Sequence, residues 1–213
     1  MSARKYLTPP FKSDRKYNQL KAEEKRLKAE LEHCSKQLRK LRHELECIEW
    51  LEGHDVNFLV SILGENTPRI LNLFKGSKSQ LRQDLFVLSE LNFKRAGFFV
   101  EFGATNGVDL SNTYLLEKDF GWNGILAEPA RCWHADLIQN RSCKIDQNCI
   151  WSDSNCILDF DEADLGEYST ISKYSALDML AENRAKKTTY TVSTLSLNDL
   201  LAKHGAPFEI DYI

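Results

Sequence analysis

Residues 97–112 read GFFVEFGATNGVDLSN, and this stretch decides the fold of the second part of the chain. It opens with a short, continuously apolar run over 97–102, as expected of a buried parallel strand. A glycine-containing turn follows over 101–107, and the polar residues 111–113 can then start a helix. A strand, a tight turn and a helix in this order are typical of an α/β nucleotide-binding unit.

The sequence around this stretch alternates between helical and strand patterns. The expected elements are a helix at 79–91, strands at 97–102 and 124–128, helices at 111–120 and 129–140, strands at 143–151 and 156–160, helices begun by Ser-x-x-Asp capping boxes at Ser175–Asp178 and Ser196–Asp199, and a last strand from 208. This alternation indicates an α/β fold, with a parallel sheet covered by helices on both faces.

The chemistry is expected where the first strand turns into its helix. Gly103 and Gly107 allow a close approach of backbone to ligand, and the start of the helix offers free N–H groups. Glu128 ends the second strand, 25 positions after Gly103, and can accept hydrogen bonds from both hydroxyls of a ribose. Glycine also serves tight turns for geometry alone, but the turn, helix, strand and terminal acid together favour a nucleotide site.

The residues in the turn narrow the choice of nucleotide. A dinucleotide fingerprint requires G-x-G-x-x-G, whereas Thr105 stands two positions after Gly103. Glu101 lies just before the turn, where a carboxylate would repel a pyrophosphate but suits the ammonium and sulfonium groups of S-adenosylmethionine. No G-K-[ST] follows, so the turn is not a P-loop. S-adenosylmethionine is therefore the expected cofactor.

Several ordered motifs in this part of the chain resemble one family. The stretch SQLRQDLFVLSELNFKRAGFFVEFGATNGVDLSNTYLLEKDFGWNGILAEP (79–129), STIS at 169–172 and TVSTLSLNDLL at 191–201 closely resemble the FkbM family of methyltransferases. The resemblance covers about residues 79–213. It implies a Rossmann-like class I methyltransferase sheet, S-adenosylmethionine as methyl donor, and methyl transfer to a hydroxyl oxygen. The family-based expectation for the acceptor is a glycan or a small metabolite.

The resemblance also assigns roles to individual residues. The matching positions are Glu101, Gly103 and Gly107 for the methionine part of the cofactor, Glu128 for its ribose, Asn148 for the region beside its adenine, and Asn112 as a further contact. In the family, the strand that begins here as FEIDYI continues into a D-x-E-G-x-E-like motif, which this chain does not contain. We therefore expect the sheet to be incomplete at its C-terminal side. The sequence would then be either a fragment of a longer gene product or a degenerate protein that no longer catalyses, and the catalytic residues of the family are expected beyond Ile213.

The first part of the chain has the pattern of a coiled coil. Residues 13–52 contain neither Gly nor Pro, and Gly53 is expected to end the helix. From Leu27 onward its seam alternates spacings of four and three, with Leu20, Leu27, Cys34, Leu41 and Ile48 at d positions and Leu31, Leu38 and Leu45 at a positions. Glu24 fills the a position between Leu20 and Leu27 and is expected to weaken the N-terminal heptad. So narrow a stripe favours pairing with another such helix, which predicts a homodimer. Residues 1–12 are expected to be a flexible N-terminus and 53–78 a helical linker.

Charge and composition exclude several classes of function. Residues 1–52 carry 13 basic and 9 acidic side chains, and their interleaving is typical of a solvated helix face. The remaining residues carry a net charge of −7, which disfavours binding to nucleic acid. We find neither a membrane span nor a secretory signal, and expect a cytoplasmic protein with reduced cysteines. The five histidines are scattered, so no metal site is expected, and Cys132-Trp133-His134 is interpreted as a packed or surface cluster. The alternative to an enzyme is a non-catalytic coiled-coil interaction protein with a remnant nucleotide-binding fold.

Overall fold

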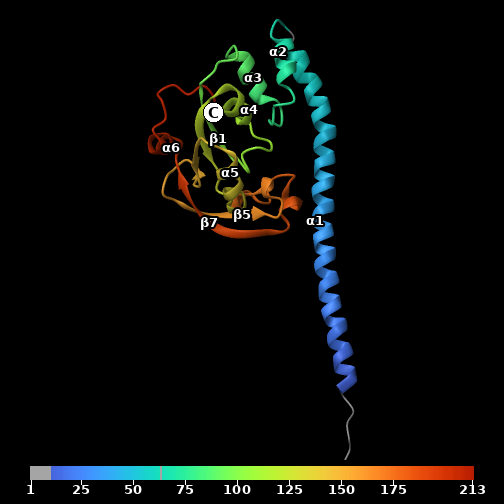
Figure 1. The fold of residues 1–213 in the computed structure, drawn as a ribbon. Helices are drawn as coiled ribbons and strands as arrows, with labels where there is room; N and C mark the ends of the chain where they lie inside the picture. The colour runs from blue at the N-terminus through green and yellow to red at the C-terminus, as the bar shows by residue number, and fades with distance from the viewer. Residues whose placement is uncertain (1–10, 63) are drawn as a thin grey trace, which may run out of the picture. The chain divides into compact units, whose positions relative to one another are not determined.

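The computed structural model describes residues 11–62 and 64–213, and side chains within them at 16–40, 54–62 and 64–213. The chain forms two compact units, Met1–Trp50 and Leu51–Ile213. The first ten residues of the expected flexible N-terminus lie outside the described part, whereas Phe11 already begins the long helix α1 (Figure 1).

Helix α1 runs without interruption over Phe11–Ser61, so the prediction that Gly53 ends it is wrong. A single glycine inside a helix costs only about 1 kcal/mol relative to alanine. Burial at the end of the helix offsets this cost, because Phe58 and the following Ile62 pack against the core of the second unit. Asp55, also near the end of the helix, forms a bidentate ion pair with Arg82, and both N···O distances are 2.8 Å.

The remaining helices are short. They are α2 (Thr67–Leu73), α3 (Gln83–Glu90), α4 (Tyr114–Phe120), α5 (His134–Asn140) and α6 (Leu197–His204), with single 3₁₀ turns at Arg131–Trp133, Gly166–Tyr168, Ser172–Tyr174 and Ala181–Arg184. Two of the sequence signals act as expected. The Ser196 hydroxyl accepts a hydrogen bond from the Asp199 N–H and caps α6, and Gly121 ends α4 in the left-handed conformation.

The first sheet contains the strand of the stretch at residues 97–112. Strands β1 (Phe98–Phe102), β2 (Asn123–Ala127) and β3 (Lys144–Asp146) lie in the order β1-β2-β3, and all run parallel. Their register pairs Phe102 with Ala127, and Ala127 with Asp146. The three strands therefore end together at one edge of the sheet.

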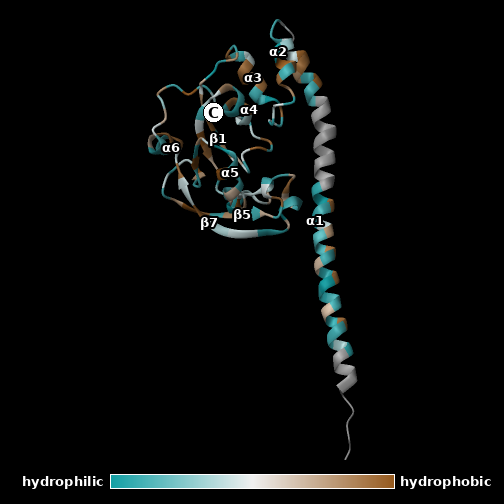
Figure 2. Cartoon of the chain, in the orientation of Figure 1, coloured by the Kyte–Doolittle hydropathy of each residue, from teal (hydrophilic) through white to brown (hydrophobic). Residues whose placement is uncertain are grey.

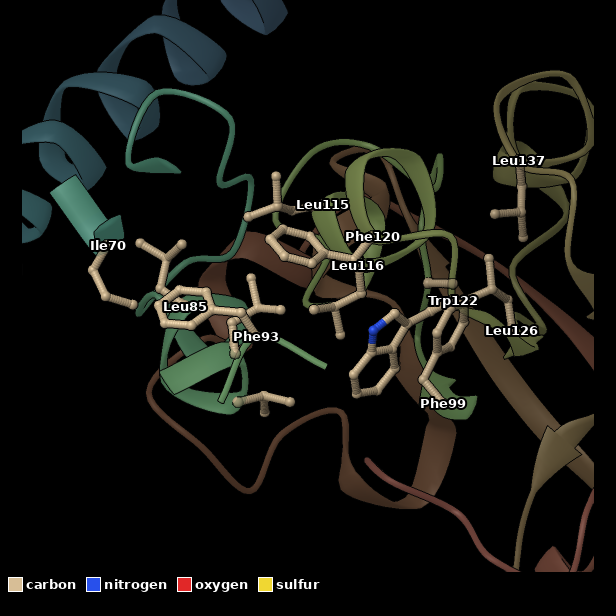
Figure 3. Close-up of a cluster of buried hydrophobic side chains, with 13 residues drawn as sticks. Ile70, Leu85, Phe93, Phe99, Leu115, Leu116, Phe120, Trp122, Leu126 and Leu137 are labelled. Carbon is tan, nitrogen blue, oxygen red and sulfur yellow. The ribbon is translucent and has the colours of Figure 1, made fainter. Parts of the chain in front are cut away.

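Helices cover both faces of this sheet, as the sequence predicts. On one face, Phe99 and Leu126 join a buried cluster with Leu115, Leu116 and other side chains from α3, α4 and α5 (Figure 3). On the other face, Val100 and Ile125 pack against Leu200 of α6. The burial of both faces explains why β1 and β2 are apolar at almost every position.

The fold contains a second sheet, which has both parallel and antiparallel strand pairs. Its strands β4 (Cys149–Ile150), β7 (Lys187–Leu195), β5 (Ile157–Ala163) and β6 (Thr170–Ile171) lie in the order β4-β7-β5-β6. Only the β4–β7 pair is parallel, while β5 pairs antiparallel with both β6 and β7. Strand β7 was missed in the sequence, although its TTYTVSTL run is rich in β-branched residues.

Three further sequence predictions need correction. The expected strand 143–151 is divided into β3 and β4, because Asn148 turns back to donate two hydrogen bonds to the Asp146 carboxylate. The expected helix at Ser175–Asp178 is absent, because the Asp178 carboxylate binds the Arg184 guanidinium instead. The expected strand from 208 is reduced to one parallel bridge between Tyr212 and Phe99.

Truncating a side chain in the buried cluster should destabilise the fold far more than truncating an exposed side chain of similar size. Leu116→Ala empties a fully buried position and should lower the free energy of unfolding by about 2–5 kcal/mol. Ile138→Ala, at a side chain that is 58% exposed on α5, is the matched control and should change it little. Urea unfolding of both variants measures the difference, and equal losses would show that this cluster is not the core.

Candidate functional site

The site lies where the parallel strands end. Gly103 follows β1 and Glu128 follows β2, and the backbone joins these positions across the sheet edge. The Gly103 N–H donates to the Ala127 carbonyl at 2.8 Å, and the Glu128 N–H donates to the Asp146 carbonyl at 2.9 Å. In open α/β sheets, ligands bind outside the carboxyl ends of the strands, so this edge is the position for a binding site.

The two glycines of the turn serve different purposes. Gly103 has a φ of +67°, and a Cβ added there would meet no atom within 4 Å, so the turn borders open space. Gly107 has a φ of +77°, but an added Cβ would come within 2.6 Å of Arg141 Cγ and 2.7 Å of Leu137 Cδ1. Glycine is therefore required at position 107 because the backbone packs closely against Leu137 of α5 and against Arg141, the residue after α5. Gly103, in contrast, leaves room for a ligand.

Glu128 is buried, with 4% of its surface exposed, and bridges two turns. Its Oε2 accepts the Thr105 N–H at 2.8 Å, and its Oε1 accepts the Ala130 N–H at 2.7 Å. Burial raises the pKa of this carboxyl, and the two N–H groups oppose that rise. Each oxygen of an ionised carboxylate has about two acceptor positions, so one on each oxygen is left for a ligand.

A pocket of about 250 Å³, here called the Glu128 pocket, opens beside these residues. Gly103, Thr105 and Glu128 form one side of it, and Gly166 and Glu167, from the segment between β5 and β6, form another. Its lining contains two carboxylates and neither Lys nor Arg. Such a lining suits a neutral or cationic ligand and disfavours a pyrophosphate.

A second pocket of about 520 Å³, here called the Asp146 pocket, shares Pro129 with the first. Asp146 is the last residue of β3, and Glu128 comes directly after the last residue of β2. The sequence patterns did not indicate Asp146 as a site residue. Its Oδ2 accepts from Lys203 Nζ and lies at the same 2.7 Å distance from His204 Nε2. Burial alone would raise the pKa of Asp146, but hydrogen bonds from Lys203, from the Asn148 N–H and from His204 outweigh it and lower that pKa to about 2.

The structure brings only some of the predicted site residues together. Gly103 and Glu128 line the Glu128 pocket, and Asn148 lines the Asp146 pocket. Glu101 and Asn112 lie behind the turn, in neither lining. The Glu101 carboxylate accepts from Ser111 Oγ at 3.0 Å, from the Asn112 N–H at 2.8 Å and from Thr113 Oγ1 at 2.5 Å, and Asn112 Oδ1 accepts from Ser79 Oγ at 2.7 Å.

A buried arginine that the sequence did not single out holds this loop in place. The Arg141 side chain is fully buried and pairs with Glu117 at 2.7 Å. It also donates to the Gly107 carbonyl at 3.0 Å, to Ser111 Oγ at 3.1 Å and to Thr113 Oγ1 at 2.8 Å. A guanidinium presents five donors in a fixed geometry, and here it connects the end of the turn to the start of α4.

The Cys132-Trp133-His134 cluster lacks the features of a reactive centre. Cys132 is exposed at the surface, but partial desolvation of its thiol, together with the nearby Glu162 and Glu128, raises the pKa of that thiol to about 12, which disfavours a thiolate nucleophile. His134 Nε2 lies 2.9 Å from the Glu128 carbonyl oxygen. Within the described residues, no group of three or more His, Cys, Asp or Glu side chains is arranged to hold a metal ion.

Comparison with family models, with curated proteins and with solved structures finds no match to this chain. Among the helices described here, none is long and apolar enough to cross a bilayer. The two pockets at the ends of the parallel strands are therefore the features of the molecule that indicate a function.

The contacts of the Asp146 carboxylate with Lys203, His204 and Asn148 should make a pH-dependent contribution to the free energy of unfolding. Because the folded-state pKa is lowered to about 2, the contribution is present above the unfolded pKa of about 4 and is lost as pH falls toward 2. Asp146→Asn should cost on the order of 2 kcal/mol of unfolding free energy at pH 7, and the difference from wild type should narrow below about pH 4. Urea unfolding between pH 7 and pH 3 measures it, with the exposed Asp136→Asn as control. A difference that stays constant with pH would contradict the ion-pair account.

Proposed function

We propose that this chain binds S-adenosylmethionine in the Glu128 pocket and is the cofactor-binding part of a methyltransferase similar to the FkbM family. The observation that carries the proposal is the Glu128 carboxylate, which has one acceptor position left on each oxygen beside the open turn at Gly103. Two neighbouring acceptor positions match the two hydroxyls of a ribose.

The strand order supports the same proposal. Strands β3, β2 and β1 are followed at the free side of β1 by residues 211–212, whose backbone bonds to Phe98 and Val100. A parallel order of 3-2-1 with a further segment beside strand 1 is that of a doubly wound, Rossmann-like sheet. The mixed second sheet is an addition to that plan.

The charge of the pocket favours S-adenosylmethionine over a dinucleotide. Glu128 and Glu167 line it without a compensating Lys or Arg. They would attract the cationic groups of this cofactor and repel a pyrophosphate. When bound, the cofactor supplies an electrophilic methyl group on its sulfonium.

The residues of this chain would bind and orient the cofactor. Glu128 would accept the ribose hydroxyls, Gly103 would let the backbone lie against the methionine part, and Asn148 would lie near the adenine. Glu101, held by Ser111, Asn112 and Thr113, would stabilise the loop behind the turn. We propose a hydroxyl of a glycan or small metabolite as the methyl acceptor.

One observation favours the second candidate, a non-catalytic protein with a remnant nucleotide fold. Both oxygens of Glu101, the carboxylate expected to attract the methionine ammonium, are bonded within the chain. This candidate predicts cofactor binding without methyl transfer, or no binding. Isotope transfer from methyl-labelled S-adenosylmethionine to hydroxyl acceptors distinguishes it from the enzyme.

Glu128→Gln should weaken S-adenosylmethionine binding by about 5- to 150-fold. The amide nitrogen of the new side chain would face the N–H of either Thr105 or Ala130, so the variant loses an acceptor and disturbs the turn. Isothermal titration calorimetry measures the affinity, and thermal unfolding checks that the variant is folded. Asp136→Asn, which removes an exposed carboxylate on α5, is the control and should bind like wild type. Equal affinities for all three proteins would show that Glu128 is structural only.

A further inference from the structure

The carboxylate that the sequence predicts for the ammonium group of the cofactor is occupied within the chain. Glu101 is buried, with 8% of its surface exposed, and lies outside the lining of the Glu128 pocket. Its two oxygens together accept three hydrogen bonds, from the Ser111 hydroxyl, the Asn112 N–H and the Thr113 hydroxyl. A cofactor bound in the pocket therefore needs another anionic group to neutralise its ammonium.

The lining of the Glu128 pocket offers such a group in Glu167. Strand β1, which ends at the pocket, is largely apolar (brown in Figure 2), and Phe102, Ile150 and Phe160 give the lining its apolar surface. Glu128 and Glu167 are the two carboxylates of this lining, which contains no Lys or Arg to neutralise them. The electrostatic potential of such a pocket favours a cation.

The Glu167 carboxylate is free to bind a ligand, whereas that of Glu128 is partly occupied. Glu128 accepts the N–H groups of Thr105 and Ala130. Glu167 is exposed, and within the described part of the chain its carboxylate forms neither a hydrogen bond nor an ion pair. All of the acceptor positions on its two oxygens are therefore open to a ligand.

The segment that carries Glu167 is fixed beside the pocket. Gly166 packs directly against Trp133, because a Cβ added at Gly166 would lie 2.7 Å from the Trp133 ring. The Tyr168 carbonyl accepts from Nε of the buried Arg184 at 2.6 Å. The contacts on both sides of Glu167 hold its 3₁₀ turn in place, so that this carboxylate stays at the pocket.

We propose that Glu167 binds the α-ammonium group of the methionine part of the cofactor. This inference rests on the proposed binding of S-adenosylmethionine in the Glu128 pocket. An ammonium has three N–H donors and suits a carboxylate with open acceptor positions, whereas a sulfonium has no donor. Two carboxylates on different segments then bind two parts of the cofactor, with Glu128 on the ribose and Glu167 on the ammonium.

Isothermal titration calorimetry of the full chain with three ligands at low ionic strength tests this assignment. S-Adenosylmethionine has both cationic groups, S-adenosylhomocysteine has the ammonium but a neutral sulfur, and deaminated S-adenosylhomocysteine has neither. Glu167→Gln should weaken binding of the first two ligands equally, by about 3- to 10-fold, and should not weaken binding of the third. Glu182→Gln, which removes an exposed carboxylate outside the pocket lining, is the matched control and should bind all three like wild type.

Added salt gives a second readout. Because Glu167 is exposed, salt should screen its attraction for the ammonium. The preference of the wild-type chain for S-adenosylhomocysteine over the deaminated ligand should therefore fall as salt is added, and that of Glu167→Gln should change less. Equal salt dependence in the two proteins would overturn the assignment.

The titrations separate a failure of this inference from a failure of the proposed function. Equal losses for S-adenosylhomocysteine and the deaminated ligand, or no loss for either, would overturn the role of Glu167 and leave the proposed cofactor site intact. A loss confined to S-adenosylmethionine would assign Glu167 to the sulfonium and overturn the inference. A wild-type chain that binds none of the three ligands would overturn the proposed function, and this inference with it.

Discussion

The Glu128 carboxylate connects the two turns on which the candidate site depends. It is placed by the parallel register of β1, β2 and β3, which brings Phe102, Ala127 and Asp146 to the same edge. Burying a carboxylate costs free energy unless hydrogen bonds replace its water. The N–H groups of Thr105 and Ala130 supply those bonds, and Thr105 does so from a left-handed backbone conformation, with φ at +48°. The acid that is proposed to orient a ribose thus also holds the turn beside it.

A second layer of polar residues holds the turn from behind. Arg141 is bonded to both the end of the turn and the start of α4, while Glu101 collects three donors from 111–113. These groups are buried and are bonded to one another or to backbone, so the loop has few alternative arrangements. The open side of the turn at Gly103 is consequently a rigid surface, which is what precise ligand orientation requires.

Sequence patterns predicted the parts of the fold that local signals determine. A continuous apolar run marked β1, a Ser-x-x-Asp box marked the start of α6, and a glycine marked the end of α4. Gly103 and Glu128 could be placed at one sheet edge because Gly103 directly follows one predicted strand and Glu128 is the last residue of the next. The parts that were missed depend on distant contacts. Asp146 pairs with His204, 58 positions away, and no local pattern indicates that pairing.

The errors have the same origin. The helix α1 continues through Gly53 because residues near its end pack on a core formed elsewhere in the chain. The expected strand at 143–151 divides because its two halves pair with different neighbours, β2 and β7. In both cases tertiary contacts outweigh a local preference of about 1 kcal/mol or less.

A crystal structure of the chain grown with S-adenosylmethionine would show whether Glu128 binds the ribose of the cofactor. We expect the cofactor in the Glu128 pocket, with both ribose hydroxyls within hydrogen-bond distance of the Glu128 carboxylate and the methionine part against Gly103. Cofactor bound elsewhere, or a Glu128 carboxylate bonded only to Thr105 and Ala130 at saturating cofactor, would contradict it.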